Sequence, residues 1–427
     1  MKIEDKDPHP KNWRPQLLLI HSNPWNKDTV DVRYMNLLNL ASQMKAGRGL
    51  SIVVSFLRGN PTSHDDRMRA EKVKNRMEFD MGQIRLRGFA KSLIYGEDQI
   101  TGSLTTLIQS AGIGGLRPNT LLLGWPINDR VANASADSEY KTFIDKLHAG
   151  VAMDMALLVA KGIDDFPACT VRLNGTVDIY WIVQDGGLCI LMAYLLKQNK
   201  VWRGCKLRVI AIAQEADNNI NMQAELEKYV YQLRIDAKIK VVDLADPQIS
   251  KNAFERTLLM EERTKFMKEL QTEMKELKEK LNNVEHPIVS VDVEINDKEC
   301  DSSEAGSVIT TDDEKKDVVE EVNTEVGVED GSVLKKKITI STDREKDRKL
   351  RALDRKKVHK MHTAVRLNEM ILEHSSDSQL VLLNLPRPPR SLEGLDDYIH
   401  YLEVLSDKVK RVLFVRGTGQ EVITTIS

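Results

Sequence analysis

The chain has 427 residues and a net charge of −2 at pH 7, and 30% of its residues are charged. This length suffices for about two or three domains, and the balanced charge gives no global field that would attract nucleic acid. Its four cysteines lack CxxC spacing, as in cytosolic proteins with reduced thiols. No apolar run approaches the ~20 residues of a membrane helix, and the polar start has no signal-peptide pattern. We therefore expect a soluble cytosolic polypeptide without a nucleic-acid partner.

The first 165 residues alternate predicted strands and helices. Four short apolar or β-branched runs predict buried strands at 16–22, 50–57, 91–96 and 119–126. Helical segments are predicted after each of them, at 29–46, 63–88, 99–113 and 140–160. Four consecutive strand–helix units with near-continuous apolar strands indicate an α/β fold, in which a mainly parallel sheet is covered by helices on both faces.

The pattern restarts after residue 165. Strands are predicted at 176–183, 206–213 and 237–245, and helices at 188–197, 222–234 and from 249 to about 283. The last helix carries one apolar stripe, formed by Leu259, Phe266, Leu270, Met274, Leu277 and Leu281. Either its first turns pack on the sheet and the rest extends into solvent, or the stripe binds a partner helix in a dimer. Since no motif recurs between the two halves, we expect two packed subdomains rather than a repeat.

Residues 286–358 are predicted to be a disordered, charged insertion. Between Val291 and Asp330 there are 15 Asp and Glu residues against 3 Lys and no aromatic residue, too little apolar surface to fold. Helical spacing returns near His362, and strands at 379–386 and 411–417 flank a helix at 394–409. We therefore assign 1–165 to a first α/β subdomain. Residues 166–285 and 359–427 form a second, which completes its sheet across the insertion.

The sequence offers no catalytic constellation. GxSxG, HExxH and the P-loop pattern do not occur, and the nine histidines lack metal-binding spacing, so we expect no enzymatic activity and no bound metal. Doubly wound sheets bind ligands where strands end and helix N-termini offer free N–H groups. Such places include Ser22 and Asn23 after the first strand and the turn with Gly124, while the loop with Lys45 and Arg48 adds two cations but precedes its strand. A nucleotide could use one of these places. Tight turns also require glycine without any ligand.

Two threonines border the predicted insertion. Thr257 lies in NAFERTLLMEERT near the base of the long helix, and Thr363 lies in MHTAVRLNEMIL, where helical spacing returns. A phosphate on either would add a charge of roughly −1.5 to −2, which is favourable at a helix N-terminus and disruptive against a packed apolar face. The alternatives to a regulatory role are a helix N-cap at Thr363 and an exposed helix position at Thr257. Position alone leaves both alternatives open.

Several long sequence blocks carry a family resemblance over 12–285 and 359–427. They are NWRPQLLL, MKAGRGLSIV, AEKVKNRM, IQSAGIGGLRPNTLLLGWP, DIYWIVQDGGLCILMAYLLKQNKVWRGCKLRV, FERTLLMEERT, MHTAVRLNEMIL, LVLLNLPRPPR and VRGTGQEVITTIS. In this order they resemble the cytosolic C-terminal domain of the cation–chloride cotransporters, specifically the potassium–chloride branch. Long blocks in a fixed order are far more specific than a single short motif.

The resemblance implies a function that composition and spacing do not. The whole protein would be an electroneutral K⁺–Cl⁻ symporter of the plasma membrane that serves cell-volume and chloride homeostasis, and this chain would be its regulatory domain on the cytosolic side. Its partners would be the transmembrane domain of the same transporter, a second copy in a homodimer, and volume- and chloride-sensing Ser/Thr kinases with their phosphatases. The family's inhibitory phosphorylation sites, in its ERTL and MHTAV blocks, match Thr257 and Thr363.

The chain also departs from the family pattern. Ile426 stands where the family has a tyrosine, which removes that candidate phosphorylation site, and Thr418 replaces a glycine of the terminal turn. The insertion shares little with vertebrate relatives, so their further phosphorylation sites do not carry over. Some relatives bind ATP in this domain, although the regulatory role requires no cofactor. The alternative function is therefore an adenine-nucleotide-binding α/β sensor domain, with ATP in the first subdomain.

Overall fold

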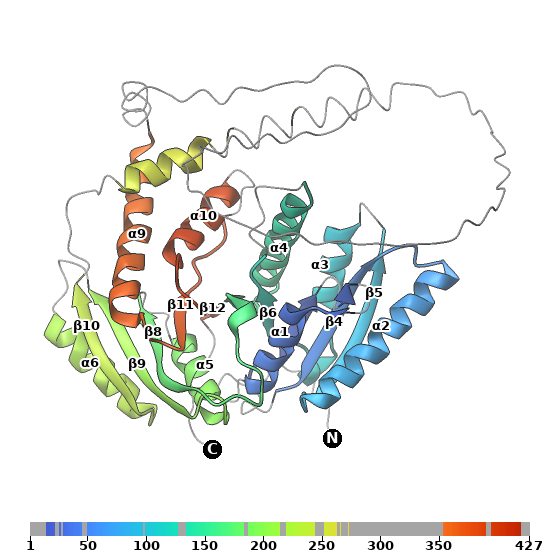
Figure 1. The fold of residues 1–427 in the computed structure, drawn as a ribbon, viewed down its shortest axis with the longest axis horizontal. Helices are drawn as coiled ribbons and strands as arrows, with labels where there is room; N and C mark the ends of the chain where they lie inside the picture. The colour runs from blue at the N-terminus through green and yellow to red at the C-terminus, as the bar shows by residue number, and fades with distance from the viewer. Residues whose placement is uncertain are drawn as a thin grey trace, which may run out of the picture. The chain divides into compact units, whose positions relative to one another are not determined.

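The computed structural model describes residues 14–21, 25–26, 29–44, 49–96, 99–126, 134–182, 187–213, 219–243, 252–262, 265, 272, 353–389 and 394–419. The chain divides into two compact units, residues 1–261 with 353–427 and residues 262–352. All labelled elements of Figure 1 belong to the first unit. The predicted insertion lies outside the described residues as far as Ala352, but the prediction was wrong at its C-terminal border, because a helix of the first unit begins at Arg355.

The first half of this unit follows the predicted alternation of strands and helices. Its strands are β1 (Leu17–His21), the two-residue β2 (Trp25–Asn26) and β3 (Thr29–Val30), β4 (Ser51–Arg58), β5 (Gly88–Tyr95), β6 (Thr120–Gly124) and β7 (Ala156–Lys161). Its helices are α1 (Val32–Gln43), α2 (His64–Gln83), α3 (Ile100–Ser110) and α4 (Ala134–Ala152), with 3-10 turns at Gly114–Leu116 and Ile163–Asp165. α2 ends before the predicted boundary because Arg85 adopts a left-handed conformation with φ of 56°.

Besides the two-residue β2 and β3, one longer strand of the first half was not predicted. The sequence pattern favoured a single helix over 140–160, but α4 ends at Ala152 and β7 begins at Ala156. Between them Asp154 takes a left-handed φ of 51°, and the backbone N of Met155 donates to the carbonyl O of Gly150 at 2.9 Å. The helix prediction was wrong there because a short, wholly apolar run has no periodicity that separates a buried strand from a buried helix.

The second half repeats the alternation. Its strands are β8 (Asn174–Trp181), β9 (Gly204–Ala213), β10 (Ala237–Asp243), β11 (Leu380–Asn384) and β12 (Val412–Arg416). Its helices are α5 (Gly187–Gln198), α6 (Asn219–Gln232), the helix 252–262, α9 (Arg355–Ser375) and α10 (Leu395–Leu405). Every strand and helix predicted for this half is found in the described ranges. The long predicted helix can be followed only over 252–262, and most of the remainder to 283 lies outside them.

Both halves contribute to one ten-stranded sheet with the order β10-β9-β8-β11-β12-β7-β6-β1-β4-β5. Every neighbouring pair is parallel except β7 and β12, which run antiparallel and join the halves, with Leu413 opposite Ala160. Counted within its own half, each set of five strands has the order third, second, first, fourth, fifth. The halves share no sequence motif, but they do share a strand order, so the expectation that they are not a repeat was wrong for the topology. Two segments can have the same strand order without a common sequence motif.

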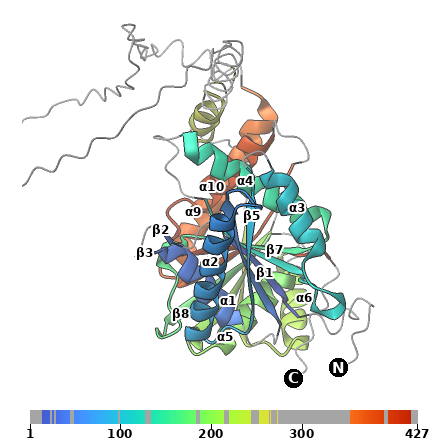
Figure 2. The ribbon, with the colours of Figure 1, turned by 90° about the vertical axis from the view of Figure 1, so that its right-hand side faces the viewer.

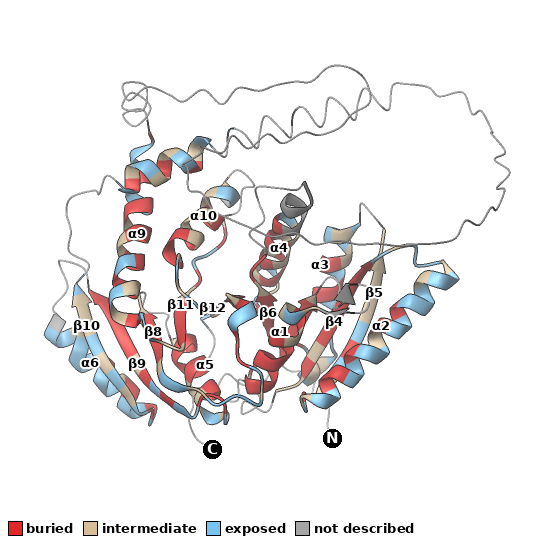
Figure 3. Ribbon diagram, in the orientation of Figure 1, coloured by how far each residue is buried: buried red, intermediate tan, exposed pale blue. Residues whose placement is uncertain are grey.

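Helices cover both faces of the sheet, as predicted (Figures 1 and 2). One core packs α1, α2, α5 and α6 against the sheet, and the other packs α3, α4, α9 and α10 against the opposite face. The central strands are buried almost throughout (Figure 3), as expected for parallel strands covered on both sides. Among the described residues, no helix is long and apolar enough to cross a membrane.

Candidate functional site

Helix 252–262 packs on α9 and α10, as the yellow segment beside α9 in Figure 1 shows. A third hydrophobic cluster joins them. Its buried members are Ala253, Met260, Met361, Ala364, Val365 and Val404, with Tyr401 packed against it. The buried positions 253, 257 and 260 follow the i, i+4, i+7 spacing of one helix face. Leu259, where the predicted stripe starts, is 63% exposed, so the helix packs with a different face. Its described apolar contacts are with α9 and α10, so the expectation that its first turns pack on the sheet was wrong for them.

Thr257 is enclosed in this contact. None of its surface is exposed, and its Oγ1 donates a hydrogen bond of 2.6 Å to the backbone carbonyl O of Ala253. A threonine whose hydroxyl bonds to the preceding turn of its own helix can lie among apolar side chains without leaving a polar atom unsatisfied. The alternative prediction of an exposed position at Thr257 was therefore wrong, because the buried face of the helix is not the face that carries Leu259.

Polar contacts fix the same surface. Arg256, next to Thr257, forms an ion pair of 3.1 Å with Asp407, just after α10. From α9, the buried amide of Asn368 donates to the backbone carbonyls of Leu405 at 3.0 Å and Asp407 at 2.9 Å. The end of α10 and the residues after it are thus held from two directions. Arg256 of helix 252–262 binds the side chain of Asp407, and Asn368 of α9 binds backbone carbonyls.

Thr363 lies on the partner helix α9, but not at its start. α9 begins at Arg355 after the N-cap Asp354, whose Oδ1 accepts from the backbone N of Lys356 at 2.9 Å. The N-cap alternative for Thr363 was wrong because the charged residues before it already form about two helical turns. Thr363 is partly exposed, and its Oγ1 donates to the carbonyl O of His359 at 3.1 Å.

Basic side chains flank Thr363 on the outer face of α9. His359 and Lys360 are exposed and lie four and three residues before it, which places them on its side of the helix. Arg366 lies three residues after it and pairs with Glu369 at 2.6 Å. A phosphate on Thr363 would therefore meet cations within one helical turn, a setting that favours charge-assisted hydrogen bonds.

The C-terminal end of α9 is tied to the sheet. Asp178 on β8 and Arg208 on β9 lie directly opposite each other, and the guanidinium grips the fully buried carboxylate through two nitrogens, one of them Nε at 2.7 Å. Arg208 Nη2 also donates to the carbonyl O of His374 at 2.9 Å. Next to it, the hydroxyls of Tyr180 and Ser375 lie 2.8 Å apart. One end of the helix that carries Thr363 is therefore fixed.

Of the five residues predicted to bind a nucleotide, the structure describes only Gly124. The strand order puts the topological switch point of the first half between β1 and β6, where ligands of such sheets bind. Gly124 ends β6 at this point, whereas the other four lie outside the described residues: Ser22, Asn23, Lys45 and Arg48. The described residues beside this switch point contact one another. His21 Nε2 lies 3.4 Å from Asp31 Oδ2, and Arg33 donates to the carbonyl O of Trp125.

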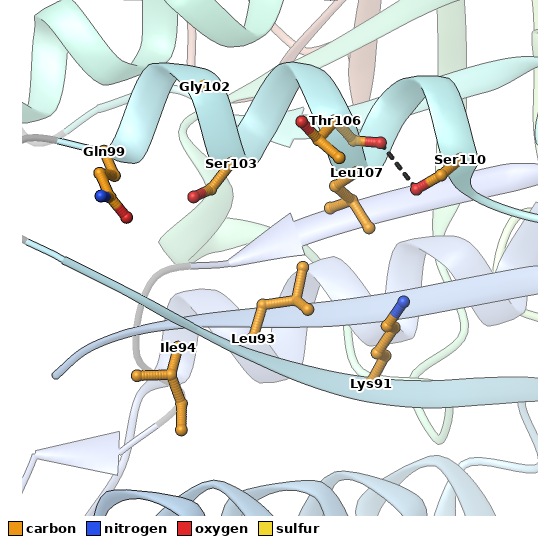
Figure 4. A pocket seen from close by; sticks show the side chains of 9 residues that line it. All are labelled: Lys91, Leu93, Ile94, Gln99, Gly102, Ser103, Thr106, Leu107 and Ser110. Atoms are coloured by element: carbon orange, nitrogen blue, oxygen red, sulfur yellow. Dashed lines mark hydrogen bonds between the residues drawn. The ribbon is translucent and has the colours of Figure 1, made fainter. Parts of the chain in front are cut away.

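A pocket of about 660 Å³ lies elsewhere, between the edge strand β5 and α3 (Figure 4). Lys91 and Leu93 point from the strand toward the helix, Ser103 and Leu107 point from the helix toward the strand, and Ile94 points away. None of the residues predicted for a nucleotide lines it. Across the described parts of the chain, no group of three or more His, Cys, Asp or Glu residues is placed to hold a metal.

Comparison with known proteins decides the family. The model of solute carrier family 12 matches residues 35–174 and 169–427. The chain belongs to solute carrier family 12. It is 43% identical over 428 aligned residues to potassium/chloride cotransporter 3 of Caenorhabditis elegans, an alignment that covers 99% of this chain and 38% of that protein. The chain thus spans well under half the length of this relative.

Two solved structures are similar to parts of this family member. The cytoplasmic domain of a prokaryotic cation chloride cotransporter matches with a TM-score of 0.37 and 16% identity, over 56% of this chain and 83% of that one. A universal stress protein from Archaeoglobus fulgidus matches with a TM-score of 0.35 and 11% identity, over 53% of this chain and 76% of that one.

Proposed function

We propose that this chain is the cytosolic regulatory domain of an electroneutral K⁺–Cl⁻ symporter, and that phosphorylation of Thr257 and Thr363 inhibits transport. One observation carries the proposal: the two threonines, far apart in the sequence, lie on helices that pack together in one cluster. Both threonines therefore belong to helices that meet in one contact, Thr257 inside it and Thr363 on the outer face of α9. The similarity to a potassium/chloride cotransporter supports K⁺ and Cl⁻ as the transported ions.

The two phosphates would act by different physical means. At Thr363 the phosphate would sit among the cations of α9 and compete with Glu369 for Arg366. It would strengthen the helix locally and reverse the charge of its outer face. At Thr257 the same group would have to fit where no surface is exposed, so it would disrupt the contact of helix 252–262.

Transport of K⁺ and Cl⁻ by the intact transporter tests the proposal. Thr257→Ala, Thr363→Ala and the double variant should each raise isotonic K⁺–Cl⁻ flux, measured as chloride-dependent rubidium uptake, because an inhibitory phosphate can no longer form. Thr105→Ala is a matched control, since Thr105 is a partly exposed helical threonine on α3 whose hydroxyl also bonds four residues back, to Thr101 O at 2.9 Å. Unchanged flux and an unchanged kinase response in the double variant would contradict the proposal.

We further propose that the domain works at the cytosolic face of the plasma membrane, joined to the transmembrane domain of its own transporter. There it would form a homodimer and be modified by volume- and chloride-sensing Ser/Thr kinases and phosphatases. The exposed Leu259, which starts the predicted apolar stripe, supports the dimer. Light scattering on the chain should give a dimer that Leu270→Glu and Leu281→Glu weaken. A monomer for the unmodified chain would refute the dimer.

An adenine nucleotide is a second candidate ligand, supported by the switch point at which Gly124 ends β6. It would serve sensing rather than catalysis. Calorimetry should show ATP binding that Lys45→Gln and Arg48→Gln weaken, while Arg203→Gln, an exposed cation of the other half, leaves it unchanged. No heat and no thermal shift at millimolar ATP would remove this candidate.

A further inference from the structure

Thr257 and Thr363 differ in access to an enzyme. The Thr257 hydroxyl has no exposed surface and is engaged with Ala253 O at 2.6 Å, whereas Thr363 is partly exposed. Phosphoryl transfer requires the accepting oxygen to come within about 3–3.5 Å of the reacting phosphorus atom, in line with the leaving oxygen. A kinase cannot bring ATP to that distance from Thr257 while α9 and α10 cover it.

We propose that Thr257 is a conditional phosphorylation site, open to a kinase only when helix 252–262 is released from α9 and α10, and that its phosphate then keeps the helix released. Thr363 accepts phosphate in the packed state. The inference rests on the proposed function, because it takes both threonines to be kinase targets. It adds an order: a signal that loosens the helix must precede modification of Thr257.

The release that this requires is local. It breaks the ion pair between Arg256 and Asp407 and exposes Ala253 and Met260, while Asn368 still holds α9 to the chain after α10. Within the described residues, the buried apolar side chains on the helix side of the contact are Ala253 and Met260. Segments held by few buried contacts open without global unfolding, so the packed and released states can exchange in the folded domain.

The chemical step then fixes the released state. The Oγ1–P bond forms as the bond between the γ-phosphorus and the bridging oxygen of ATP breaks, ADP leaves, and the hydroxyl proton passes to the kinase's catalytic carboxylate. The product carries a charge of roughly −1.5 to −2. If the helix returned to its packed position, the phosphate would lie on the same face as Ala253 and Met260, in an apolar contact. The carboxylate of Asp407 would again approach Arg256, the neighbour of the phosphorylated residue. An apolar contact cannot take up this charge, so the helix stays released.

Thiol labelling of the full chain tests the access without a kinase. Thr257→Cys and Thr363→Cys are treated with iodoacetamide, and peptide mass spectrometry separates them from the native cysteines. Cys at 257 should react at least about tenfold more slowly than Cys at 363. Adding Met260→Ala, which removes a side chain only 2% exposed, should raise the rate at 257 at least about tenfold. Adding Leu259→Ala, next to it but 63% exposed, should leave the rate unchanged.

Phosphorylation supplies the second measurement. A Ser/Thr kinase preparation that modifies a synthetic peptide of residues 252–262 is applied to the full chain. Thr257 should react slowly in the unmodified chain and in Leu259→Ala, and at least about tenfold faster in Met260→Ala, with the rate at Thr363 equal in all three. Equal labelling at 257 and 363, or a Thr257 rate that Met260→Ala does not change, overturns the proposal. Unchanged ion flux in the threonine-to-alanine transporter, with labelling as expected, would instead overturn only the proposed function.

Discussion

Replacing Arg208 by methionine should loosen the C-terminal end of α9, the helix that carries Thr363. The guanidinium of Arg208 donates hydrogen bonds to the fully buried carboxylate of Asp178 on the neighbouring strand. It also donates to His374 O at 2.9 Å. Methionine keeps much of the side chain's length and apolar stem but removes every donor. The variant therefore leaves Asp178 buried without its cation and the carbonyl of His374 without this donor.

The expected cost follows from the burial of the two partners. Breaking a fully buried ion pair by removing one partner costs about 3–5 kcal/mol, because the remaining charge stays uncompensated. The Arg208 side chain is 34% exposed, so water can reach the site once the guanidinium is gone. We therefore expect a loss of about 2–4 kcal/mol in unfolding free energy. Adding Asp178→Asn removes the stranded charge and should return about 1–2 kcal/mol of that loss.

Urea unfolding followed by circular dichroism at pH 7 measures these differences, provided that the slope of free energy against urea is unchanged. Hydrogen exchange should rise at the end of α9. Lys74→Met is the control, because Lys74 pairs with Glu71 at 3.3 Å on the exposed face of α2 and should cost less than about 0.5 kcal/mol. The reasoning fails if Arg208→Met costs no more than Lys74→Met, or if Asp178→Asn adds to its loss instead of reducing it.

Three further substitutions test the joint between the halves and the packing of α9. Gly162→Ala should lower thermal stability by more than about 2 kcal/mol, because φ is 72° and a Cβ would lie 2.1 Å from Lys410 O, whereas Gly102→Ala, in an open helical position, should raise it by about 0.5–1 kcal/mol. Burial lowers the pKa of Lys161 from its ordinary 10.5 to about 8, despite opposing carboxylates. Above about pH 8 the unfolded chain therefore binds more protons than the folded protein, so the free energy of unfolding should rise between about pH 8 and about pH 9.5. Urea titration measures this rise, and Lys161→Met should remove it. Asn368→Ala should cost about 1–3 kcal/mol in the same assay, since two buried carbonyls lose their donor.

Local pattern predicted most of the fold and missed its central joint. Strands such as β1, β4 and β6 are short apolar runs bounded by turns, so they could be predicted from composition alone. β7 is equally apolar, but the helical pattern of α4 runs into it and the intervening turn depends on Asp154 rather than on glycine or proline. Without β7, the antiparallel pairing with β12 that unites the halves could not be foreseen. Register across such distances is a tertiary property that no local window contains.

The same limit applies to the site. The two threonines could be selected from their sequence blocks and their place beside the insertion, but the burial of Thr257 depends on α9 and α10, which follow far along the chain. Arg208 and Asp178 gave no sequence signal, because a charge inside a strand reads as a solvent-facing position until its partner strand is known. A sequence signal did exist for helix 252–262: positions 253, 257 and 260 are spaced for one face.

The repeated strand order shows which connection distinguishes the second half from the first. In the first half, the described part of the connection from the third strand, β5, to the fourth, β6, contains α3 and a 3-10 turn, whereas the equivalent route from β10 to β11 contains helix 252–262, the second compact unit and α9. Both threonines therefore belong to one crossover connection. α9 is held to the sheet through Arg208 and to the chain after α10 through Asn368, whereas the buried apolar side chains that helix 252–262 contributes within the described residues, Ala253 and Met260, lie in one small cluster. Because an element held by few buried side chains opens first, a phosphate on Thr257 should keep helix 252–262 released while α9 stays in place.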